Sequence, residues 1–101
     1  MADIPVSVII TTKNEEANIA RCLAALDRFA EVWVVDSESS DKTCEIAKAH
    51  GAKVKTYRWD GRYPKKRQWC LENLALAHDW VFFVDADEVV TPELVDEIAA
   101  L

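Results

Sequence analysis

The stretch VSVIITTKNEEANIARCL, residues 6–23, decides the fold class of this chain. Its first part, VSVIIT at 6–11, is almost entirely apolar and rich in β-branched residues, as expected for a strand that is covered on both faces of a sheet. Apolar residues then recur at helical spacing over 19–26, and Asn14, followed directly by two acids, is a suitable N-cap for this helix. A buried strand that leads into a helix predicts an α/β unit.

The same unit recurs downstream. VWVVD at 32–36 predicts a second buried strand, and Asp41 is expected to cap a helix that ends near Ala49, where Gly51 can adopt the left-handed conformation that stops a helix. KVKTY at 53–57 alternates between polar and apolar residues, which is typical of an edge strand. The chain therefore begins with two strand–helix units and a third strand.

The second part of the chain continues this alternation. A polar loop leads to a helix expected over 65–78, with Leu71, Leu74 and Ala75 on its buried side. WVFFV at 80–84 then predicts a fourth buried strand.

A last helix is expected to run to Leu101, because Thr91 supplies an N-cap, Pro92 suits the first helical position and Glu93 favours the first turn. Strands that alternate with helices predict a parallel sheet joined by right-handed crossovers. The simplest doubly wound order for four such strands is 3-2-1-4. We therefore predict an α/β fold with a doubly wound, mainly parallel sheet.

Length and composition indicate the number of domains and the cellular compartment. A chain of 101 residues, half of them hydrophobic, can bury one core but not two, so we expect one domain over 1–101. No apolar run approaches the ~18 residues that span a bilayer, and no basic and apolar leader opens the sequence. The three cysteines form no CxxC pair, which favours a reducing compartment. These features predict a soluble, cytoplasmic protein.

Acidic residues follow the fourth strand, where a doubly wound sheet binds its ligand. Such ligands lie outside the carboxyl ends of the strands where the strand order reverses, here between the first and fourth strands. The segments placed there are TTKNEE at 11–16, DSESSD at 36–41 and DADE at 85–88. Asp85 and Asp87 could both reach one Mg²⁺ or Mn²⁺ ion, whose coordination phosphate oxygens would complete. The alternative is that Asp85 caps the turn and Asp87 is simply solvated.

Two further residues could contact different parts of such a ligand. Asp36, at the end of the second strand, could accept a hydrogen bond from a ribose hydroxyl or a base N–H, or it could instead form the turn. Arg67, near a helix start, offers a planar fork suited to phosphate, although it could be one more solvated cation. Seven of the twelve basic residues lie between Lys53 and Arg67, whereas eight acids and no Lys or Arg follow Arg67. A ligand that is both anionic and metal-bound would use both groups of charges, although two solvated faces would give the same pattern.

Four segments together carry a resemblance to a known family: VSVIITTKNEEANIARCL, VWVVDSESSDKT, KKRQWCL and WVFFVDADE. In this order and spacing they resemble the Rossmann-like, N-terminal nucleotide-binding half of the family 2 glycosyltransferases, which have the GT-A fold. The resemblance is greatest to the branch that transfers sugars to the lipopolysaccharide core. It implies a metal-dependent transfer of a sugar from a nucleoside diphosphate donor, a UDP-sugar, to a lipopolysaccharide, another saccharide or a lipid-linked acceptor.

The resemblance also implies a set of nucleotide-binding residues: Thr11, Lys13, Glu15, Asp36, Arg67 and Asp85. The first three would line the base pocket, Asp36 would hold the uracil or ribose end, and Arg67 would meet the phosphates. Asp85 and Asp87 would form the DxD motif, with Asp87 as the principal ligand of Mg²⁺ or Mn²⁺.

The chain departs from the family pattern in three respects. Glu38 stands where the family usually has glycine, and Lys13 stands where many relatives have an aromatic residue. The family places its general base and its acceptor site in a further part of the domain, beyond the equivalent of Leu101. We therefore expect this chain to be a donor-binding fragment of a larger catalytic domain, with no catalytic residue of its own and no transfer activity.

Other functions fit parts of the sequence. The DADEVV segment at 85–90 also resembles the nucleophile strand of haloacid dehalogenase-like phosphatases, and a non-catalytic nucleotide-binding domain would share the same fold. Only Gly51 and Gly61 are present, so GxGxxG and P-loop sites are excluded. Aromatic and basic residues alternate over 59–69, but the net charge of -6 argues against nucleic acid and leaves a peripheral contact with the inner face of the membrane open.

Overall fold

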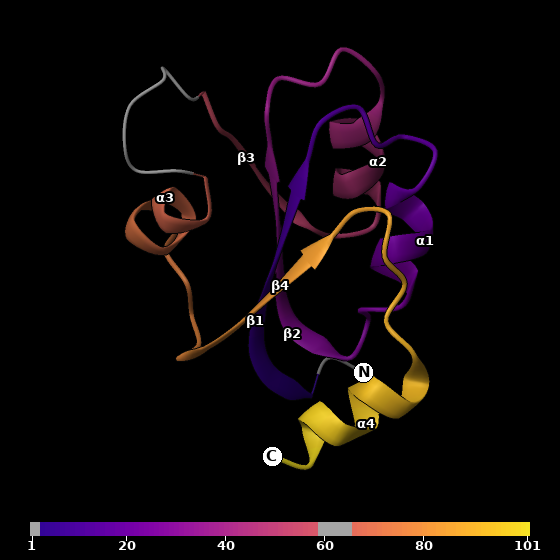
Figure 1. Ribbon diagram of the computed structural model, residues 1–101, viewed down its shortest axis with the longest axis vertical. Coiled ribbons are helices and arrows are strands. Elements are labelled where there is room, and N and C mark those ends of the chain that lie inside the picture. Colours follow the sequence, from indigo (N-terminus) through magenta and orange to yellow (C-terminus); the bar gives the residue numbers. More distant parts are fainter. Residues whose placement is uncertain (1–2, 59–65) are drawn as a thin grey trace.

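The strands form one four-stranded parallel sheet in the order β3-β2-β1-β4 (Figure 1). The computed structural model describes residues 3–58 and 66–101, and the side chains of these ranges except those of 66–68. The strands are β1 (Ile4–Thr12), β2 (Phe29–Asp36), β3 (Lys53–Thr56) and β4 (Trp80–Asp85). The predicted fold class and the order 3-2-1-4 are confirmed.

Helices cover both faces of this sheet, as a doubly wound fold requires. They are α1 (Ile19–Ala24), α2 (Thr43–Ala49), α3 (Lys66–Asn73) and α4 (Pro92–Ala99). In Figure 1, α3 lies on one side of the sheet, whereas α1 and α2 lie on the other.

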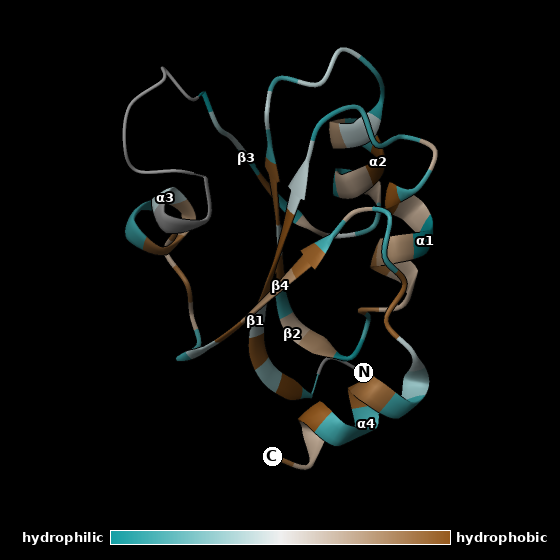
Figure 2. Cartoon of the chain, viewed as in Figure 1, coloured by the Kyte–Doolittle hydropathy of each residue, from teal (hydrophilic) through white to brown (hydrophobic). Residues whose placement is uncertain are grey.

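The alternation of side chains along β1 explains the two apolar cores. Val8 and Ile10 point into the larger cluster, which α1, α2 and α4 also line, while Ile9 points to the opposite cluster with Cys70 and Leu74. The three β1 side chains are fully buried. A strand covered on both faces is apolar at most positions, and the buried Ser7 of β1 is hydrogen-bonded to Glu31. Figure 2 shows the hydrophobic strands at the centre with hydrophilic loops at the upper end.

The predicted stop of α2 is confirmed. Gly51 adopts a φ of +84°, which is the left-handed conformation that a side chain disfavours. Its N–H donates to the carbonyl of Lys48 at 3.0 Å, and the N–H of Ala52 donates to the carbonyl of Ala47 at 3.1 Å. These two bonds satisfy carbonyls that the end of the helix would otherwise leave unpaired.

The predicted start of α4 is also confirmed. The Oγ1 of Thr91 accepts a hydrogen bond from the N–H of Leu94 at 3.1 Å, and Pro92 occupies the first helical position.

The predicted cap of α1 is wrong, whereas that of α2 is displaced by one residue. α1 begins at Ile19, and Asn14 lies well before it in a left-handed conformation with a φ of 53°. Its side chain bonds to Ser40, in the loop after β2, and is therefore engaged away from α1. At α2 the N-cap position falls on Lys42, one residue after Asp41. Asp41 Oδ1 nevertheless accepts from the N–H of Thr43, the first residue of the helix, at 3.0 Å.

The helix predicted over 65–78 is shorter than expected: α3 ends at Asn73. Beyond that residue the chain turns toward the sheet, and the N–H of Ala77 donates to Glu31 Oε1 of β2 at 3.0 Å. This tertiary bond requires the segment after Asn73 to leave the helical path.

The buried side of α3 also differs from the prediction. Leu71 is 53% exposed and Ala75 is exposed, whereas Cys70 and Leu74 are buried. Leu74 is buried as predicted, and Ala75 lies beyond the end of α3. Within α3 the buried position is that of Cys70, and Leu71, the next residue around the helix, faces outward.

Candidate functional site

The carboxyl ends of β1, β2 and β4 bring together three of the predicted site segments. In the strand register Thr12 lies opposite Asp36, and Thr11 lies opposite Asp85. These ends and the loops that follow them form the upper part of the molecule in Figure 1. We call this end of the sheet the carboxyl edge.

Asp36 is the buried centre of the carboxyl edge. It is 2% exposed, and its Oδ1 accepts hydrogen bonds from Thr12 Oγ1 at 2.6 Å and Ser39 Oγ at 2.5 Å. Its Oδ2 accepts from the N–H of Ser39 at 2.8 Å. Burial opposes ionisation, but the hydrogen bonds from Ser39, Thr12 and Cys44 outweigh it, so the pKa of Asp36 lies below its usual value. The carboxylate therefore shapes the turn after β2, which is the structural role considered for it.

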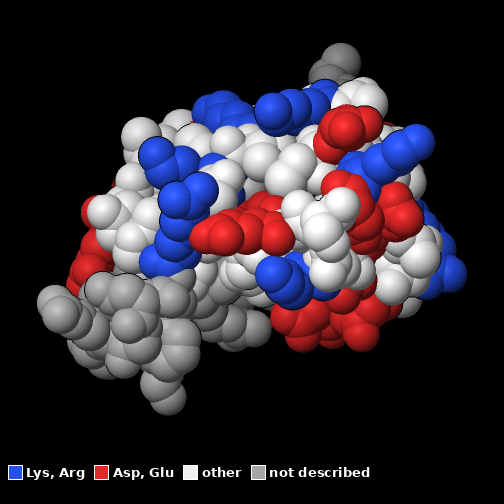
Figure 3. Space-filling model, turned by 90° about the horizontal axis from the view of Figure 1, so that it is seen from above, with Lys and Arg blue, Asp and Glu red and all other residues white. Residues whose placement is uncertain are grey.

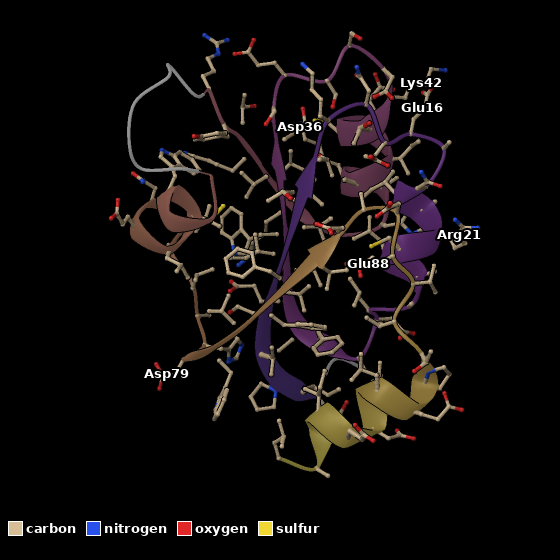
Figure 4. All side chains as sticks on the ribbon, viewed as in Figure 1. Glu16, Arg21, Asp36, Lys42, Asp79 and Glu88 are labelled. Atoms are coloured by element: carbon tan, nitrogen blue, oxygen red, sulfur yellow. The ribbon has the colours of Figure 1, made fainter. Side chains whose placement is uncertain are left out.

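The loops after β1 and β2 are hydrogen-bonded to each other. Glu16 accepts from the N–H of Lys42 at 3.1 Å and donates its own N–H to Asp41 at 3.2 Å. Figure 4 shows Glu16 and Lys42 side by side at the top of the molecule. The N–H of Glu15 also donates to Thr43 Oγ1 at 2.9 Å. Two segments that are 25 or more residues apart thus form one surface.

The three residues assigned to the base pocket share the segment at the end of β1. Thr11 is half-buried, whereas Lys13 is exposed and donates from Nζ to the carbonyl of Glu38 at 3.3 Å. Glu15 is half-buried and accepts from Asn18 Nδ2 at 3.1 Å.

Glu38, at a position where the family resemblance leads us to expect glycine, adopts a left-handed backbone conformation. Its φ is 53°, in the left-handed region, so the turn keeps the geometry that suits glycine and also carries a side chain. The carboxylate forms an ion pair with Arg58, with Nε and Oε1 2.7 Å apart. The pairing with Arg58 was not foreseen from the sequence, because the two residues are twenty positions apart and no local pattern links them.

The acids after β4 form a closed turn. Glu88 Oε1 accepts from the N–H of Asp85 at 2.9 Å, and the N–H of Glu88 donates to the carbonyl of Asp85 at 2.9 Å. Ala86 is buried, and Asp85, Asp87 and Glu88 are exposed. The turn-closing role of Glu88 was missed, although its position three residues after Asp85 is a recognisable signal for a local turn.

The thiol of Cys22 contacts this turn, and its pKa responds to the acids around it. Its Sγ donates to the carbonyl of Asp85 at 3.7 Å. Burial, and then the negative charges of Glu88, Asp87, Asp85 and Glu15, raise the pKa of Cys22 to about 11. Carboxylates from two loops therefore act on one point, and Figure 3, which looks down on this end, shows Asp and Glu gathered on the face with Lys and Arg around them.

The donor set at this turn suits a hard divalent cation bound together with a phosphate. Among the residues that the structure describes, no group of three or more His, Cys, Asp or Glu could hold a metal ion. Asp85 and Asp87 nevertheless present exposed carboxylates, and Mg²⁺ is commonly bound by one or two carboxylates plus substrate phosphates. The site therefore fits a metal that arrives with its ligand.

The side chain predicted to contact phosphate belongs to Arg67. The backbone of Arg67 belongs to α3, but its side chain lies outside the described residues, as do positions 59–65 of the basic and aromatic segment.

An apolar hollow of about 280 Å³ lies at the opposite end of β4. Ile4, Trp80, Phe82, Ile98 and Leu101 are among the residues that line it. Because its lining has no charged side chain, it does not suit a diphosphate, and we place the candidate site at the carboxyl edge. Among the described residues, no helix has the length and apolarity needed to cross a membrane.

A known protein family matches the sequence that forms this site. The model of the family described as Glycosyl transferase family 2 matches residues 7–101. An uncharacterized glycosyltransferase of Rickettsia typhi is 46% identical over 94 residues, which cover 92% of this chain and 31% of that protein. The lipopolysaccharide core biosynthesis glycosyltransferase LpsC of Rhizobium meliloti is 36% identical over 90 residues, which cover 84% of this chain and 32% of LpsC.

Solved structures of a glucosyl-3-phosphoglycerate synthase have a fold similar to that of this chain. Glucosyl-3-phosphoglycerate synthase of Mycobacterium tuberculosis, in complex with phosphoglyceric acid, superposes with a TM-score of 0.69 at 28% identity, over 90% of this chain and 37% of that one. The same enzyme in complex with Mn²⁺, UDP and glucosyl-3-phosphoglycerate gives a TM-score of 0.65 at 28% identity, over 80% of this chain and 33% of that one.

The chain spans about a third of the length of the curated relatives it matches. The similarity to LpsC agrees with the lipopolysaccharide-core branch expected from the sequence, and the GT-A fold is confirmed. The family match covers nearly the whole chain, so this chain belongs to glycosyl transferase family 2.

Proposed function

We propose that this chain is the donor-binding part of a metal-dependent glycosyltransferase. In the full-length protein it would bind a nucleoside diphosphate sugar, a UDP-sugar, for transfer to a lipopolysaccharide or another saccharide or lipid-linked acceptor. The observation that carries this proposal is the strand register, which sets Thr11 opposite Asp85 and Thr12 opposite Asp36 at one edge of the sheet. A ligand lying across these strand ends would reach both the base-side loops and the acidic turn.

The base and ribose would lie against the loops after β1 and β2. Thr11 lies near the end of β1, Lys13 and Glu15 follow on the loop, and Lys13 is exposed. Asp36 would act at the uracil or ribose end, either directly or through the hydroxyl groups of Thr12 and Ser39 that it holds.

The diphosphate would lie between the acidic turn and the basic segment. Asp87, together with Asp85, would hold Mg²⁺ or Mn²⁺, and Arg67 would contact the phosphates from the start of α3. A bound cation neutralises the charge of the diphosphate as it leaves the sugar. The solved complexes of the mycobacterial synthase contain UDP with Mn²⁺ or with Mg²⁺, which supports this choice of cofactor for a member of the same fold.

We do not assign a general base to any described residue. The relatives are about three times as long as this chain, and we propose that their additional length supplies the base and the acceptor site. Residues 1–101 would then be a nucleotide-sugar-binding domain that binds donor without transferring it. The proposed location is the cytoplasm, with peripheral contact at the inner face of the membrane where the acceptor is lipid-linked.

Calorimetric titration of UDP into the 101-residue chain, with and without Mn²⁺, tests the proposal. We expect weak binding that becomes stronger with Mn²⁺, because the metal links the acidic turn to the diphosphate. ADP serves as the matched nucleotide, since it carries the same diphosphate on a different base. Binding of UDP that Mn²⁺ does not affect would contradict the metal assignment, and equal binding of ADP would contradict the base pocket.

A non-catalytic nucleotide-binding role uses the same site and predicts the same titration. It differs in the full-length protein, which would then bind UDP-sugar and neither transfer nor hydrolyse it. The phosphatase alternative has no further support, because the family match assigns residues 7–101 to the glycosyltransferases.

A further inference from the structure

We infer that Asn14 is a positioning residue, which locks the loop after β1 onto the loop after β2 and so presents Lys13 and Glu15 to the donor. This inference rests on the proposed function. It concerns a side chain that has no assigned role in the site, and whose predicted role as a helix cap proved wrong.

The contacts of Asn14 all cross from one loop to the other. Its Oδ1 accepts from the N–H of Ser40 at 2.8 Å and from Ser40 Oγ at 3.3 Å, and its own N–H donates to Ser39 Oγ at 2.7 Å. The partners are 25 and 26 residues away along the chain. Asn14 therefore uses both its backbone and its side chain to join the two loops.

These bonds continue into the buried centre of the carboxyl edge. Ser39 also donates from Oγ to Asp36, which in turn accepts from Thr12 at the end of β1. The path from Thr12 through Asp36 and Ser39 ends on the backbone N–H of Asn14, which closes a ring of hydrogen bonds around residues 12–14. The side chain of Asn14 adds the bonds to Ser40 outside this ring. A ring of this kind holds the intervening Lys13 at a defined height above the sheet.

The neighbours of Asn14 extend the connection on both sides. Lys13 Nζ donates to the carbonyl of Glu38, the N–H of Glu15 donates to Thr43 Oγ1, and Glu16 exchanges bonds with Asp41 and with the N–H of Lys42. The two loops can therefore move only together. The position of Lys13 and Glu15, on the loop after β1, therefore depends on the loop after β2.

Asparagine suits this position for two reasons. Its φ of 53° lies in the left-handed region, which Asn enters more readily than most residues with a side chain. Its side chain is also short, which places the amide oxygen where it accepts from the backbone N–H of the facing loop. Glycine would satisfy only the first requirement, and alanine satisfies neither, so substitutions can separate the two.

Three substitutions in the 101-residue chain test the inference by UDP titration with Mn²⁺. Asn14→Gly keeps the backbone conformation and removes the acceptor, and we expect UDP affinity to fall at least tenfold with little change in melting temperature. Asn14→Asp keeps both features and should bind within threefold of the parent. Asn14→Ala should lose both affinity and melting temperature. Asn73→Gly, at the end of α3, is the matched control and should leave UDP affinity unchanged.

Amide hydrogen exchange gives a second readout that needs no ligand. The N–H of Ser40 loses its acceptor in Asn14→Gly, whereas the N–H of Lys42 keeps Glu16. We expect both to exchange faster than in the parent, because the two loops loosen as one unit. Unchanged exchange in this variant overturns the loop coupling. Faster exchange with unchanged UDP affinity overturns the positioning role. A parent chain that binds no UDP overturns the proposed function and with it the positioning role, while the exchange rates still decide the loop coupling.

Discussion

Glu31 and Lys53, on the neighbouring strands β2 and β3, form an ion pair in which Lys53 Nζ lies 2.7 Å from Glu31 Oε2, although the side chain of Glu31 is only 3% exposed. Oε1 of the same carboxylate accepts from Ser7 Oγ at 2.7 Å and from the N–H of Ala77 at 3.0 Å. The buried carboxylate of Glu31 therefore connects β2 to β1, to β3 and to the segment before β4. Its hydrogen bonds and the charge of Lys53 offset the desolvation free energy of the buried charge.

This network predicts a loss of stability in acid. Burial alone would raise the pKa of Glu31, but the bonds from Lys53, Ala77 and Ser7 and the charge of Lys53 lower it from 4.5 to about 2. Because the folded pKa lies below the unfolded value, the stabilisation is complete above about pH 4.5 and disappears as the pH falls toward 2. The shift corresponds to about 3 kcal/mol in the free energy of unfolding.

Urea denaturation between pH 7 and pH 2 measures this effect. Glu31→Gln should unfold more easily at pH 7 by about 3 kcal/mol, and the difference from the parent should vanish at the acid end of the series. The exposed Glu97→Gln is the control and should follow the parent. A constant difference between Glu31→Gln and the parent at every pH would show that the charge of Glu31 is not responsible.

Asp87→Asn should separate metal binding from folding. The change keeps the shape of the side chain but removes one charge from the proposed cation site, so UDP affinity in the presence of Mn²⁺ should fall at least tenfold, or about 1.4 kcal/mol. The melting temperature should stay the same or rise, because Asp85, Asp87 and Glu88 repel one another without a cation.

Calorimetry and thermal unfolding of the same Asp87→Asn sample provide both values. Asp79→Asn is the matched control, since Asp79 precedes β4 at its opposite end (Figure 4) and should not affect UDP binding. A lower melting temperature with unchanged UDP affinity would instead make Asp87 a structural turn residue.

Glu38 should reveal the cost of its left-handed backbone. Glu38→Gly and Glu38→Ala both remove the ion pair with Arg58, but only alanine keeps a Cβ in the disfavoured conformation. The glycine variant should therefore be the more stable of the two by about 1 kcal/mol. Because both partners of the ion pair are exposed, its own contribution is at most about 1 kcal/mol and should weaken in 1 M salt.

Urea denaturation of both Glu38 variants, at low and high salt, checks these values. If the alanine variant proves as stable as the glycine variant, the turn after β2 has relaxed to a conformation with negative φ.

Thr12→Val should weaken the centre of the carboxyl edge. Valine has nearly the shape of threonine, but it cannot donate to Asp36, whose buried carboxylate then lacks one of its partners. We expect the free energy of unfolding to fall by about 1–3 kcal/mol. Thr56→Val is the control, because Thr56 lies opposite Asp36 on β3 but is exposed, and it should change the stability by less than about 0.5 kcal/mol. Equal losses in the two variants would show that the hydroxyl of Thr12 is not special.

The sequence allowed the prediction of features whose partners lie close along the chain. The cap of Thr91 on Leu94 and the stop at Gly51 each depend on a few consecutive residues, and both predictions are confirmed. The strand order also followed, because continuous apolar strands alternating with helices leave few arrangements.

Features that depend on distant partners could not be predicted in the same way. Asn14 is of a residue type that often caps helices, but its side chain bonds to Ser40, 26 residues away. The early end of α3 depends on a bond between Ala77 and Glu31, 46 residues apart, and nothing in the local pattern of either segment indicates it. The same limit applied to the ion pair that Glu38 forms.

The two polar networks of β2 lie at different points along one strand. Glu31 and Asp36 are five residues apart, which corresponds to about 16 Å of extended chain. The first network secures the lower half of the sheet, and the second shapes the loops at the carboxyl edge. Mutations in those loops can therefore accumulate without loosening the attachment of the segment that leads into β4. Under the proposed donor-binding role, a lineage could exchange one sugar donor for another through changes in these loops while the Glu31 network stayed the same.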